Sequence, residues 1–483
     1  MDGTALCTLR DCTFAYSGEG TALHGVSLHV RAGELVMLVG PSGCGKTTVT
    51  RLINGLAPGH FTGTLTGHAC TGSLEAGRAP LESYARVVGS VFQNPKTQYF
   101  HARSTDELAF PCENAGMPAP QIRERVRQVA ARFGIADLLD RAIVNLSGGQ
   151  QQRLAVASAA VLEPAVMVLD EPTSNLDTAS MARLHGMIAA LKADGVAIVI
   201  AEHRLAWCAD LVDRYCVFDG GELLGAYTAR EFEALPATQR EAWGLRALDV
   251  SADRARIAEL ARAAHGEGAP VLGTRGLEVG YRKRALFRRG VEFSLRIPDV
   301  DVYGGQIVGI MGHNGAGKST FARTLCGLQV PLAGTVELGG EPASASALSR
   351  AAALVMQDVH YQLFAESVRA EVMLETVQDG GELAAAREQC DALLGELDLL
   401  DVADRHPMSL SGGQKQRLAI AVALMGKKRF VVLDEPTSGL DRAHMMQVGA
   451  LLRELAGLGV AVLVITHDDE LAAHWCDRIL ALD

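Results

Sequence analysis

The sequence predicts an α/β protein made of two homologous domains, each built on a doubly wound parallel sheet. Three motifs occur twice in the 483 residues: GPSGCGKT at 40–47 and GHNGAGKS at 312–319, LSGGQ at 146–150 and 410–414, and LDEPTS at 169–174 and 433–438. Each glycine loop follows a short apolar run and precedes a helix-forming segment, which is the strand, loop and helix order of a phosphate-binding domain. The chain is therefore a tandem duplication.

Short apolar runs predict the buried strands of both halves. They lie at 35–39, 165–169 and 196–201 in the first half and at 307–311, 430–433 and 461–466 in the second. A helix is expected from Thr47 onward and another over 150–161. Because polar residues follow several of these strands directly, the chemistry is expected at the carboxyl ends of parallel strands.

The spacing of the repeats predicts the domain limits. The loop lysines are 272 residues apart, whereas the matched motifs from Gln93 to His203 keep an offset of 264. The segments of unequal length lie before the glutamines, and we expect them to form surface β-hairpins. We expect a first domain over 1–229, a helical connector over 230–270 and a second domain over 271–483.

Composition excludes several classes of protein. Hydrophobic residues make up 48% and charged residues 21% of the chain, as in ordinary globular proteins. The net charge of −11 disfavours nucleic acid as a partner. No apolar run approaches the roughly 18 residues of a membrane span. The ten cysteines form no CxxC pair, so we expect no zinc site. The N-terminus lacks the pattern of a secretory signal, so we expect a cytoplasmic chain with reduced thiols.

The two glycine loops predict nucleotide sites. Glycine lets successive N–H groups turn towards a phosphate, the following helix adds its positive end, and the loop lysine reaches the outer phosphates. The expected nucleotide-binding residues are Gly40, Ser42, Gly43, Cys44, Gly45, Lys46, Thr47 and Thr48 in the first half and Gly312, Asn314, Gly315, Ala316, Gly317, Lys318, Ser319 and Thr320 in the second. Cys44 is either a reactive thiol or a small tolerated side chain.

An Asp-Glu pair ends a predicted strand in each half, at 170–171 and 434–435. Neighbouring side chains on a strand diverge, so one carboxylate can serve a metal ion while the other faces an attacking water. We assign Glu171 and Glu435 to the water. The expected Mg²⁺ ligands are Thr47, Asp170, Ser319 and Asp434. The alternative is an acidic strand-to-turn cap; the equal spacing of 24 residues from each LSGGQ serine disfavours it.

LSGGQ predicts a second anion site in each half. Its serine is a good N-cap, its glycines permit close backbone approach, and a helix-forming run follows. The expected nucleotide-binding residues are Ser147, Gly148, Gly149 and Gln150, and Ser411, Gly412, Gly413 and Gln414. A capping motif without a ligand is the alternative.

The order of phosphate loop, glutamine, LSGGQ, LDEPTS and final histidine resembles the ATP-binding-cassette (ABC) ATPases, over nearly the whole chain and twice. The resemblance implies two P-loop ATPase domains, each with an antiparallel β subdomain and a helical subdomain that carries LSGGQ. It further implies ATP and Mg²⁺ as cofactors. The residues it adds are catalytic Gln93, His203, Gln357 and His467, of which both glutamines also serve Mg²⁺, and the adenine-stacking Tyr16 and Tyr281. For the tyrosines, core packing remains an alternative.

Cassettes of this family pair head to tail, which the resemblance implies for the two halves of this chain. Lys46 would then work against Ser411, and Lys318 against Ser147. Neither half departs from the catalytic pattern, so we expect two hydrolytic sites.

A narrower resemblance concerns VFQNPKTQ at 91–98 and DELAFPCENAG at 106–116, which are similar to the ATPases of energy-coupling-factor (ECF) transporters for vitamins and metals. It implies transmembrane partner subunits that dock near Gln98–Cys112 and Gln362–Glu371, and a peripheral location at the cytoplasmic face of the cell membrane. The second half lacks the Asn-Pro element, so the two docking grooves are expected to differ.

Two other functions stay open. A tandem ATPase acting on ribosomes, as in the ABC-F factors, would carry a longer and strongly charged connector, which this chain lacks. A regulatory subunit without hydrolysis is disfavoured by the intact glutamates.

Overall fold

The computed structural model describes residues 5–18, 20–174, 176–263, 268–285, 288–356, 362–378, 383–410 and 412–482. The chain divides into two compact units, Met1–Asp249 with Gly439–Ala443, and Val250–Ser438 with His444–Asp483. The division falls within 230–270, where the sequence predicts a connector, so the domain limits given above stay a prediction. Within the described residues, no helix is long and apolar enough to cross a bilayer.

The first unit is built on a six-stranded sheet. Its strands are β3 (Leu35–Val39), β6 (Val88–Val91), β7 (Val166–Asp170), β8 (Ala197–Ala201), β9 (Arg214–Asp219) and β10 (Glu222–Thr228). The order is β10-β9-β3-β8-β7-β6, with β10 antiparallel to β9 and all other neighbours parallel. The predicted parallel sheet and its strands are confirmed, with bounds shifted by one residue in places.

Strand β3 lies at the centre of the unit because both of its faces are covered. Leu35, Met37 and Val39 pack into one hydrophobic core, and Val36 and Leu38 pack into another on the opposite face. All five side chains are fully buried. Burial of each is worth about 1.5–3 kcal/mol, which fixes the strand that leads into the glycine loop.

A second, antiparallel sheet covers one face of the first. It consists of β1 (Ala5–Tyr16), β2 (Thr21–Arg31), β4 (Gly63–Thr71) and β5 (Leu74–Glu75), in the order β2-β1-β4-β5. This sheet contains part of the segment whose length differs between the repeats, as expected for β-hairpins. The antiparallel subdomain is therefore confirmed.

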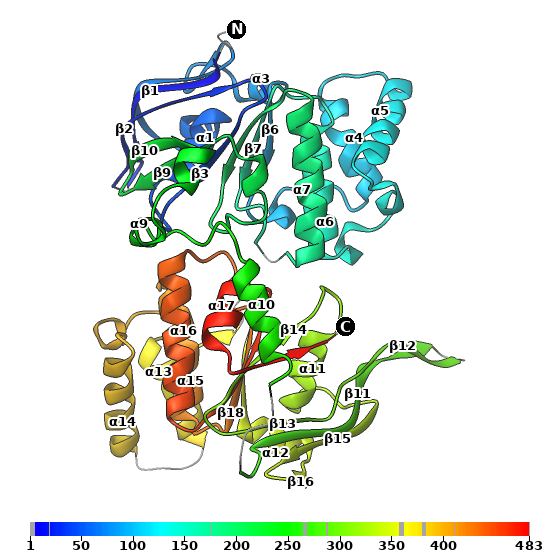
Figure 1. Cartoon of the computed structure of the whole chain (residues 1–483), viewed down its shortest axis with the longest axis vertical. Coiled ribbons are helices and arrows are strands. Elements are labelled where there is room, and N and C mark those ends of the chain that lie inside the picture. Colours follow the sequence, from blue (N-terminus) through cyan, green and yellow to red (C-terminus); the bar gives the residue numbers. More distant parts are fainter. Residues whose placement is uncertain are drawn as a thin grey trace. The chain divides into compact units, whose positions relative to one another are not determined.

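Helices pack on both faces of the parallel sheet. They are α1 (Lys46–Ile53), α2 (Leu56–Gly59), α3 (Leu81–Tyr84), α4 (Ser104–Asn114), α5 (Ala119–Arg132), α6 (Gly148–Ala160), α7 (Thr178–Ala193), α8 (Ala229–Glu233) and α9 (Ala237–Ala242). In Figure 1, α4, α5 and α6 lie on the side of the unit opposite β1 and β2. Since α6 begins within LSGGQ, the predicted helical subdomain is confirmed.

The second unit repeats this architecture. Its parallel sheet has the order β17-β18-β19-β14-β20, and its antiparallel sheet the order β12-β11-β15-β16, with β13 paired to β11. The strands are β11 (Leu272–Ala285), β12 (Arg288–Arg296), β13 (Val300–Val302), β14 (Ile307–Met311), β15 (Ala333–Leu338), β16 (Glu341–Pro342), β17 (Ala352–Val355), β18 (Phe430–Asp434), β19 (Ala461–Ile465) and β20 (Arg478–Ala481).

The helices of the second unit include one without a match in the first. They are α10 (Ser251–Leu260), α11 (Lys318–Leu325), α12 (Ala345–Ala351), α13 (Val368–Gln378), α14 (Leu383–Glu396), α15 (Gly412–Met425), α16 (Arg442–Gly457) and α17 (Asp469–Trp475). Helix α17 begins two residues after His467, whereas the chain after His203 forms turns and a short 3-10 helix, Ala209–Leu211. Helix α10 packs on α17, with an ion pair of 2.9 Å between Arg254 Nε and Asp469 Oδ2.

Candidate functional site

Each glycine loop turns sharply into a helix at a residue that must be glycine. Gly45 precedes α1 with φ of 103°, and Gly317 precedes α11 with φ of 95°. A Cβ atom at position 45 would lie 2.6 Å from Leu23 Cδ2 and 2.9 Å from the Ala22 oxygen. Left-handed backbone and lack of space both exclude larger residues.

The loop lysine bends back over its own loop in both units. Lys46 Nζ donates hydrogen bonds to the carbonyl oxygens of Gly40 at 2.9 Å and Pro41 at 2.8 Å. Lys318 Nζ donates to the two equivalent carbonyl oxygens at 2.8 and 3.0 Å. Both lysines are buried, so each ammonium group is fixed at the loop.

The predicted Mg²⁺ ligands are brought together in both units. Thr47 Oγ1 donates to Asp170 Oδ1 at 3.2 Å, and Ser319 Oγ donates to Asp434 Oδ2 at 2.9 Å. Burial raises the pKa of both aspartates above the usual value. Hydroxyl and carboxylate oxygens are the ligands that Mg²⁺ prefers, and a bound cation would offset the burial of the carboxylates. The donor set thus fits Mg²⁺.

Both predicted catalytic glutamates have left-handed backbone. Glu171 has φ of 44° and Glu435 φ of 51°. Their N–H groups donate to the Ala201 and Ile465 oxygens at 2.8 and 2.9 Å. This conformation costs a residue with a side chain about 1–2 kcal/mol. The same strain at the same position of both repeats is typical of a functional site.

In the first unit, three predicted catalytic residues meet. Gln93 Nε2 donates to Glu171 Oε2 at 2.6 Å, and His203 Nε2 lies 3.6 Å from Glu171 Oε1. Burial, followed by the nearby carboxylates of Glu202 and Asp170, raises the pKa of Glu171 to about 8. A carboxylate with a pKa near neutrality can accept a proton from water.

The second unit has the same pair with different neighbours. His467 Nε2 lies 3.5 Å from Glu435 Oε1. It also lies 2.9 Å from Lys318 Nζ and 2.9 Å from Asn314 Oδ1. Loop lysine, loop asparagine and final histidine are therefore in contact here. Gln357 lies outside the described residues, so its role stays a prediction.

The two predicted adenine-stacking tyrosines are held differently. The Tyr16 hydroxyl accepts a hydrogen bond from Arg51 Nη1 at 2.9 Å and shares one of 3.1 Å with Thr48 Oγ1. The Tyr281 hydroxyl accepts from Thr320 Oγ1 at 3.3 Å, and this residue is 43% exposed. Both lie beside the first turn of the loop helix, and Tyr16 is the more firmly fixed.

The serine of the first LSGGQ caps a helix as predicted. Ser147 Oγ accepts from the Gln150 N–H at 3.3 Å, and Gln150 Oε1 accepts from the Ser147 N–H at 2.9 Å. Ser411 lies outside the described residues. A Cβ atom at Gly149 would lie 2.2 Å from Ser180 Oγ, so packing alone requires glycine there, whereas at Gly413 the nearest atom would be 3.9 Å away.

The sequence reasoning missed one buried acid of the first site. Glu202 precedes His203, and its carboxylate is bonded to Thr173 of LDEPTS. A sequence signal for this acid exists: each half has one acidic residue next to its final histidine, Glu202 before the histidine in the first half and Asp468 after it in the second.

The comparisons with known proteins agree with this geometry. A family model described as ABC transporter matches residues 23–174 and 295–438. A protein of Treponema denticola named as an ABC transporter ATP-binding protein is 38% identical over 481 residues, which cover 99% of this chain and 95% of that protein. The chain belongs to the ABC transporter family of ATP-binding proteins. It is an ATPase, and domains of this family bind ATP, typically with Mg²⁺.

One further relative and one solved structure are similar to almost the whole chain. A Bacillus subtilis protein named for HMP/thiamine import is 30% identical over 510 residues, covering 99% of this chain and 90% of that protein. A structure of ribosome-bound archaeal Pelota and ABCE1 has a TM-score of 0.65 at 22% identity, covering 98% of this chain and 76% of that one. At that identity it shows the tandem fold alone.

Proposed function

We propose that this chain is the ATP-binding and hydrolysing subunit of an ECF-type importer for a vitamin, a metal ion or another micronutrient. It would act at the cytoplasmic face of a membrane together with transmembrane subunits. Similarity along the whole chain to proteins named as transporter subunits, one of them for HMP/thiamine import, supports this. The structural observation that carries the proposal is an apolar groove beside each of the two predicted docking segments, Gln98–Cys112 and Gln362–Glu371.

In the proposed reaction, Lys46 holds the outer phosphates of ATP. Thr47 and Asp170 would hold Mg²⁺, which would supply positive charge beside the phosphate oxygens when bound. Glu171 accepts a proton from the attacking water while the water oxygen bonds to the γ-phosphorus and the bond to ADP breaks, and His203 keeps Glu171 oriented. The matching residues of the second unit act likewise. We also propose that the halves pair head to tail, so that LSGGQ of one closes the ATP of the other.

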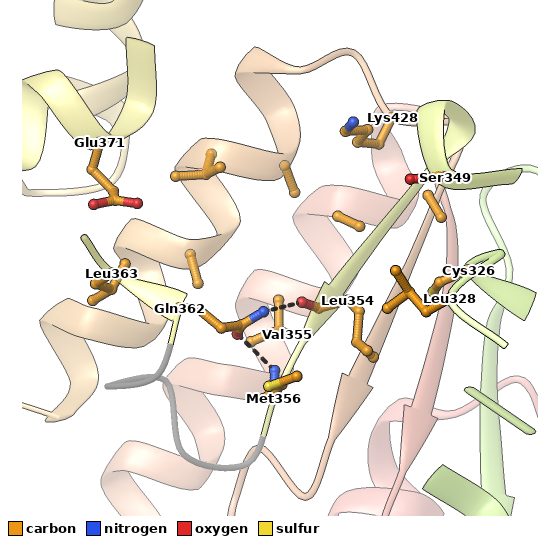
Figure 2. A pocket seen from close by; sticks show the side chains of 15 residues that line it. Cys326, Leu328, Ser349, Leu354, Val355, Met356, Gln362, Leu363, Glu371 and Lys428 are labelled. Carbon is orange, nitrogen blue, oxygen red and sulfur yellow. Dashed lines mark hydrogen bonds between the residues drawn. The ribbon is translucent and has the colours of Figure 1, made fainter. Parts of the chain in front are cut away.

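The groove of the second unit has a volume of about 290 Å³. Figure 2 shows it between Cys326 and Leu328 on one side and Leu363 on the other, with Val355 and Met356 at its base. Apart from Glu371, Gln362, Ser349 and Lys428, its lining side chains are apolar. A helix with an apolar face would suit this groove.

Two polar side chains fix the edge of this groove. Gln362 donates to the Leu354 oxygen and accepts from the Met356 N–H at 2.8 Å, as the dashed lines of Figure 2 show. The buried Glu371 carboxylate accepts from the Phe364 N–H at 2.8 Å and from the next N–H at 2.6 Å. The Phe364 side chain is nevertheless 79% exposed.

The first unit repeats the arrangement at a groove of about 280 Å³. Gln98 donates to the Ser90 oxygen at 2.9 Å and accepts from the Phe92 N–H at 3.2 Å. The buried Glu107 carboxylate accepts from the Phe100 N–H at 3.0 Å and from the next N–H at 2.9 Å. Phe100 is 77% exposed.

A phenylalanine held outside the core by buried polar contacts, twice at matched positions, suits an aromatic anchor for a partner. In the first unit the same segment also carries Gln93, which contacts Glu171. Occupation of the groove by a partner can thus be sensed at the catalytic carboxylate through a short stretch of chain.

The test uses the full chain, produced in its native host and extracted gently from membranes. We expect membrane-spanning subunits to co-purify, as identified by mass spectrometry, and expect a double variant, Phe100→Ala with Phe364→Ala, to lose them while keeping ATP binding. Val144→Ala is the matched control, because Val144 is 86% exposed and lies outside both grooves. Co-fractionation of the wild type with ribosomes instead of membranes would reject the transport proposal in favour of a ribosome-acting ATPase.

A further inference from the structure

A buried carboxylate next to the final histidine of the first unit is saturated with hydrogen bonds. Glu202 is 3% exposed. Its Oε2 accepts from Thr173 Oγ1 at 2.6 Å and from the Thr173 N–H at 3.3 Å. Its Oε1 accepts from the N–H groups of His203 at 2.7 Å and Arg204 at 3.2 Å. Among the described residues, four groups donate to this carboxylate; burial raises the pKa of Glu202, and these donors favour its ionised form.

In the second unit, the threonine that matches Thr173 also donates to a carboxylate, but this carboxylate comes from a different position in the repeat. Position 466, which matches Glu202, is Thr466, and the acid is Asp468, one residue after the histidine. Asp468 Oδ2 accepts from Thr437 Oγ1 at 2.8 Å, and Oδ1 accepts from the Leu471 N–H at 3.3 Å as the N-cap of α17. Thr437 matches Thr173 in the repeat.

We propose that Glu202 and Asp468 are equivalent positioning residues for ATP hydrolysis. Each ties the threonine of LDEPTS to the segment of the final histidine, one from before the histidine and the other from after it. This inference rests on the catalytic roles proposed above for Glu171 and Glu435.

The connection to the reacting groups is short. Thr173 is two residues after Glu171, whose left-handed backbone is closed by a hydrogen bond of 3.3 Å from the Ser174 N–H to the Glu171 oxygen. On the other side, the Glu202 carboxylate accepts directly from the His203 N–H. Loss of this bridge would let Glu171 and His203 move independently. A displacement of about 1 Å at a catalytic group can lower a rate by about a hundredfold.

The charge balance also differs between the two units. Burial raises the pKa of Glu202, while its hydrogen bonds and, last, the positive charge of Arg204 act in the opposite direction. Arg204 Nη1 is buried without a hydrogen-bond partner among the described residues. Arg204 stands where the second unit has Asp468. The first unit therefore has an acidic residue before its final histidine and a cationic residue after it. The second unit has a neutral residue before its final histidine and an acidic residue after it.

The test compares steady-state ATP hydrolysis, ATP affinity and thermal unfolding of full-chain variants. Glu202→Gln replaces one acceptor oxygen by an N–H₂ group that must face donors. We expect it to lower turnover at the first site by about tenfold or more, so that kcat of the whole chain falls by about half, while KM and the affinity for ATP stay near the wild-type values. Asp468→Asn is the matched variant of the second unit and is expected to behave likewise.

Relocation of the carboxylate separates positioning from general stability. The double variant Glu202→Thr with Arg204→Asp gives the first unit the pattern of the second, and we expect it to recover most of the kcat that Glu202→Thr alone loses. Failure of this rescue, or wild-type kcat in Glu202→Gln, would overturn the proposal. If the Glu202 variants do not fold, Thr173→Val and Thr437→Val test the bridge from its other end, and unchanged kcat in both rejects it.

Glu171→Gln is measured in parallel. Wild-type turnover in that variant would reject the catalytic assignment itself, whatever the Glu202 variants do. None of these assays depends on a membrane partner, so failure of the transport proposal would leave them unaffected.

Discussion

The two matched glycines of LSGGQ should respond differently to a single added methyl group. At position 149 a Cβ atom would lie 2.2 Å from Ser180 Oγ and 2.7 Å from Ser180 Cβ. The Ser180 N–H is bonded to Asp177 Oδ1 at 2.7 Å, so relief requires the start of α7 to shift. At position 413 the nearest atom would be 3.9 Å away.

Overpacking of this kind costs about 1–3 kcal/mol, whereas alanine in place of glycine in a helix gains up to about 1 kcal/mol. Gly149→Ala should therefore be less stable than Gly413→Ala by about 2 kcal/mol. For cassettes of this size the difference corresponds to about 4–8 °C in the melting temperature of the affected unit.

Differential scanning calorimetry of both variants and the wild type measures these shifts. ATP hydrolysis is measured on the same samples. Packing does not require glycine at position 413, so if Gly413 serves the nucleotide site, Gly413→Ala should lose ATP turnover while keeping the stability of the wild type. Equal melting temperatures for the two variants would refute the packing argument.

Three other predictions concern the ATP sites. Glu171→Gln and Glu435→Gln should each lower steady-state ATP hydrolysis, and wild-type turnover in either would contradict two hydrolytic sites. Arg51→Ala should weaken the binding of a fluorescent ATP analogue several-fold by freeing the Tyr16 ring, whereas the matched Arg323→Ala should not, because no hydrogen bond between Arg323 and Tyr281 is found among the described residues. Burial raises the pKa of Glu171 to about 8 in the folded protein. Without Mg²⁺ the folded state is therefore most stable, as far as this group is concerned, below about pH 4.5, and it loses that stability as the pH rises through 8. Glu171→Gln should melt at an increasingly higher temperature than the wild type over this range, and a constant difference would contradict the raised pKa of Glu171.

The sequence was sufficient to predict the scaffold and to predict that several of the candidate site residues of each unit lie together. Lys46, Thr47 and Asp170 could be placed together because they sit on a loop and a strand end whose patterns are local and strong. Because each pattern occurs in both halves of the chain, a chance match is a much weaker explanation for it. The strand bounds were accurate to about one residue because both faces of each central strand are buried, which leaves a continuous apolar run.

What the sequence could not show depends on side chains that meet from distant segments. Nothing near Glu202 in the chain indicates that its carboxylate reaches Thr173, and nothing near Tyr16 indicates that Arg51 holds its hydroxyl. The left-handed backbone of Glu171 and Glu435 was equally hidden, because it follows from the hydrogen bonds to the neighbouring strand and not from residue preference. Gly149 was assigned to the nucleotide, while the structure gives it a packing role as well.

The packing of α10 on α17 has a practical consequence for anyone who separates the two halves. Helix α10 covers the helix that follows His467 and is tied to it by the Arg254–Asp469 ion pair. A second half that starts at residue 271 would lack α10 and, with it, the ion pair to Asp469 at the start of α17, two residues after the predicted catalytic His467. Co-expression of two polypeptides divided just before Val250 keeps α10 and α17 in the same polypeptide.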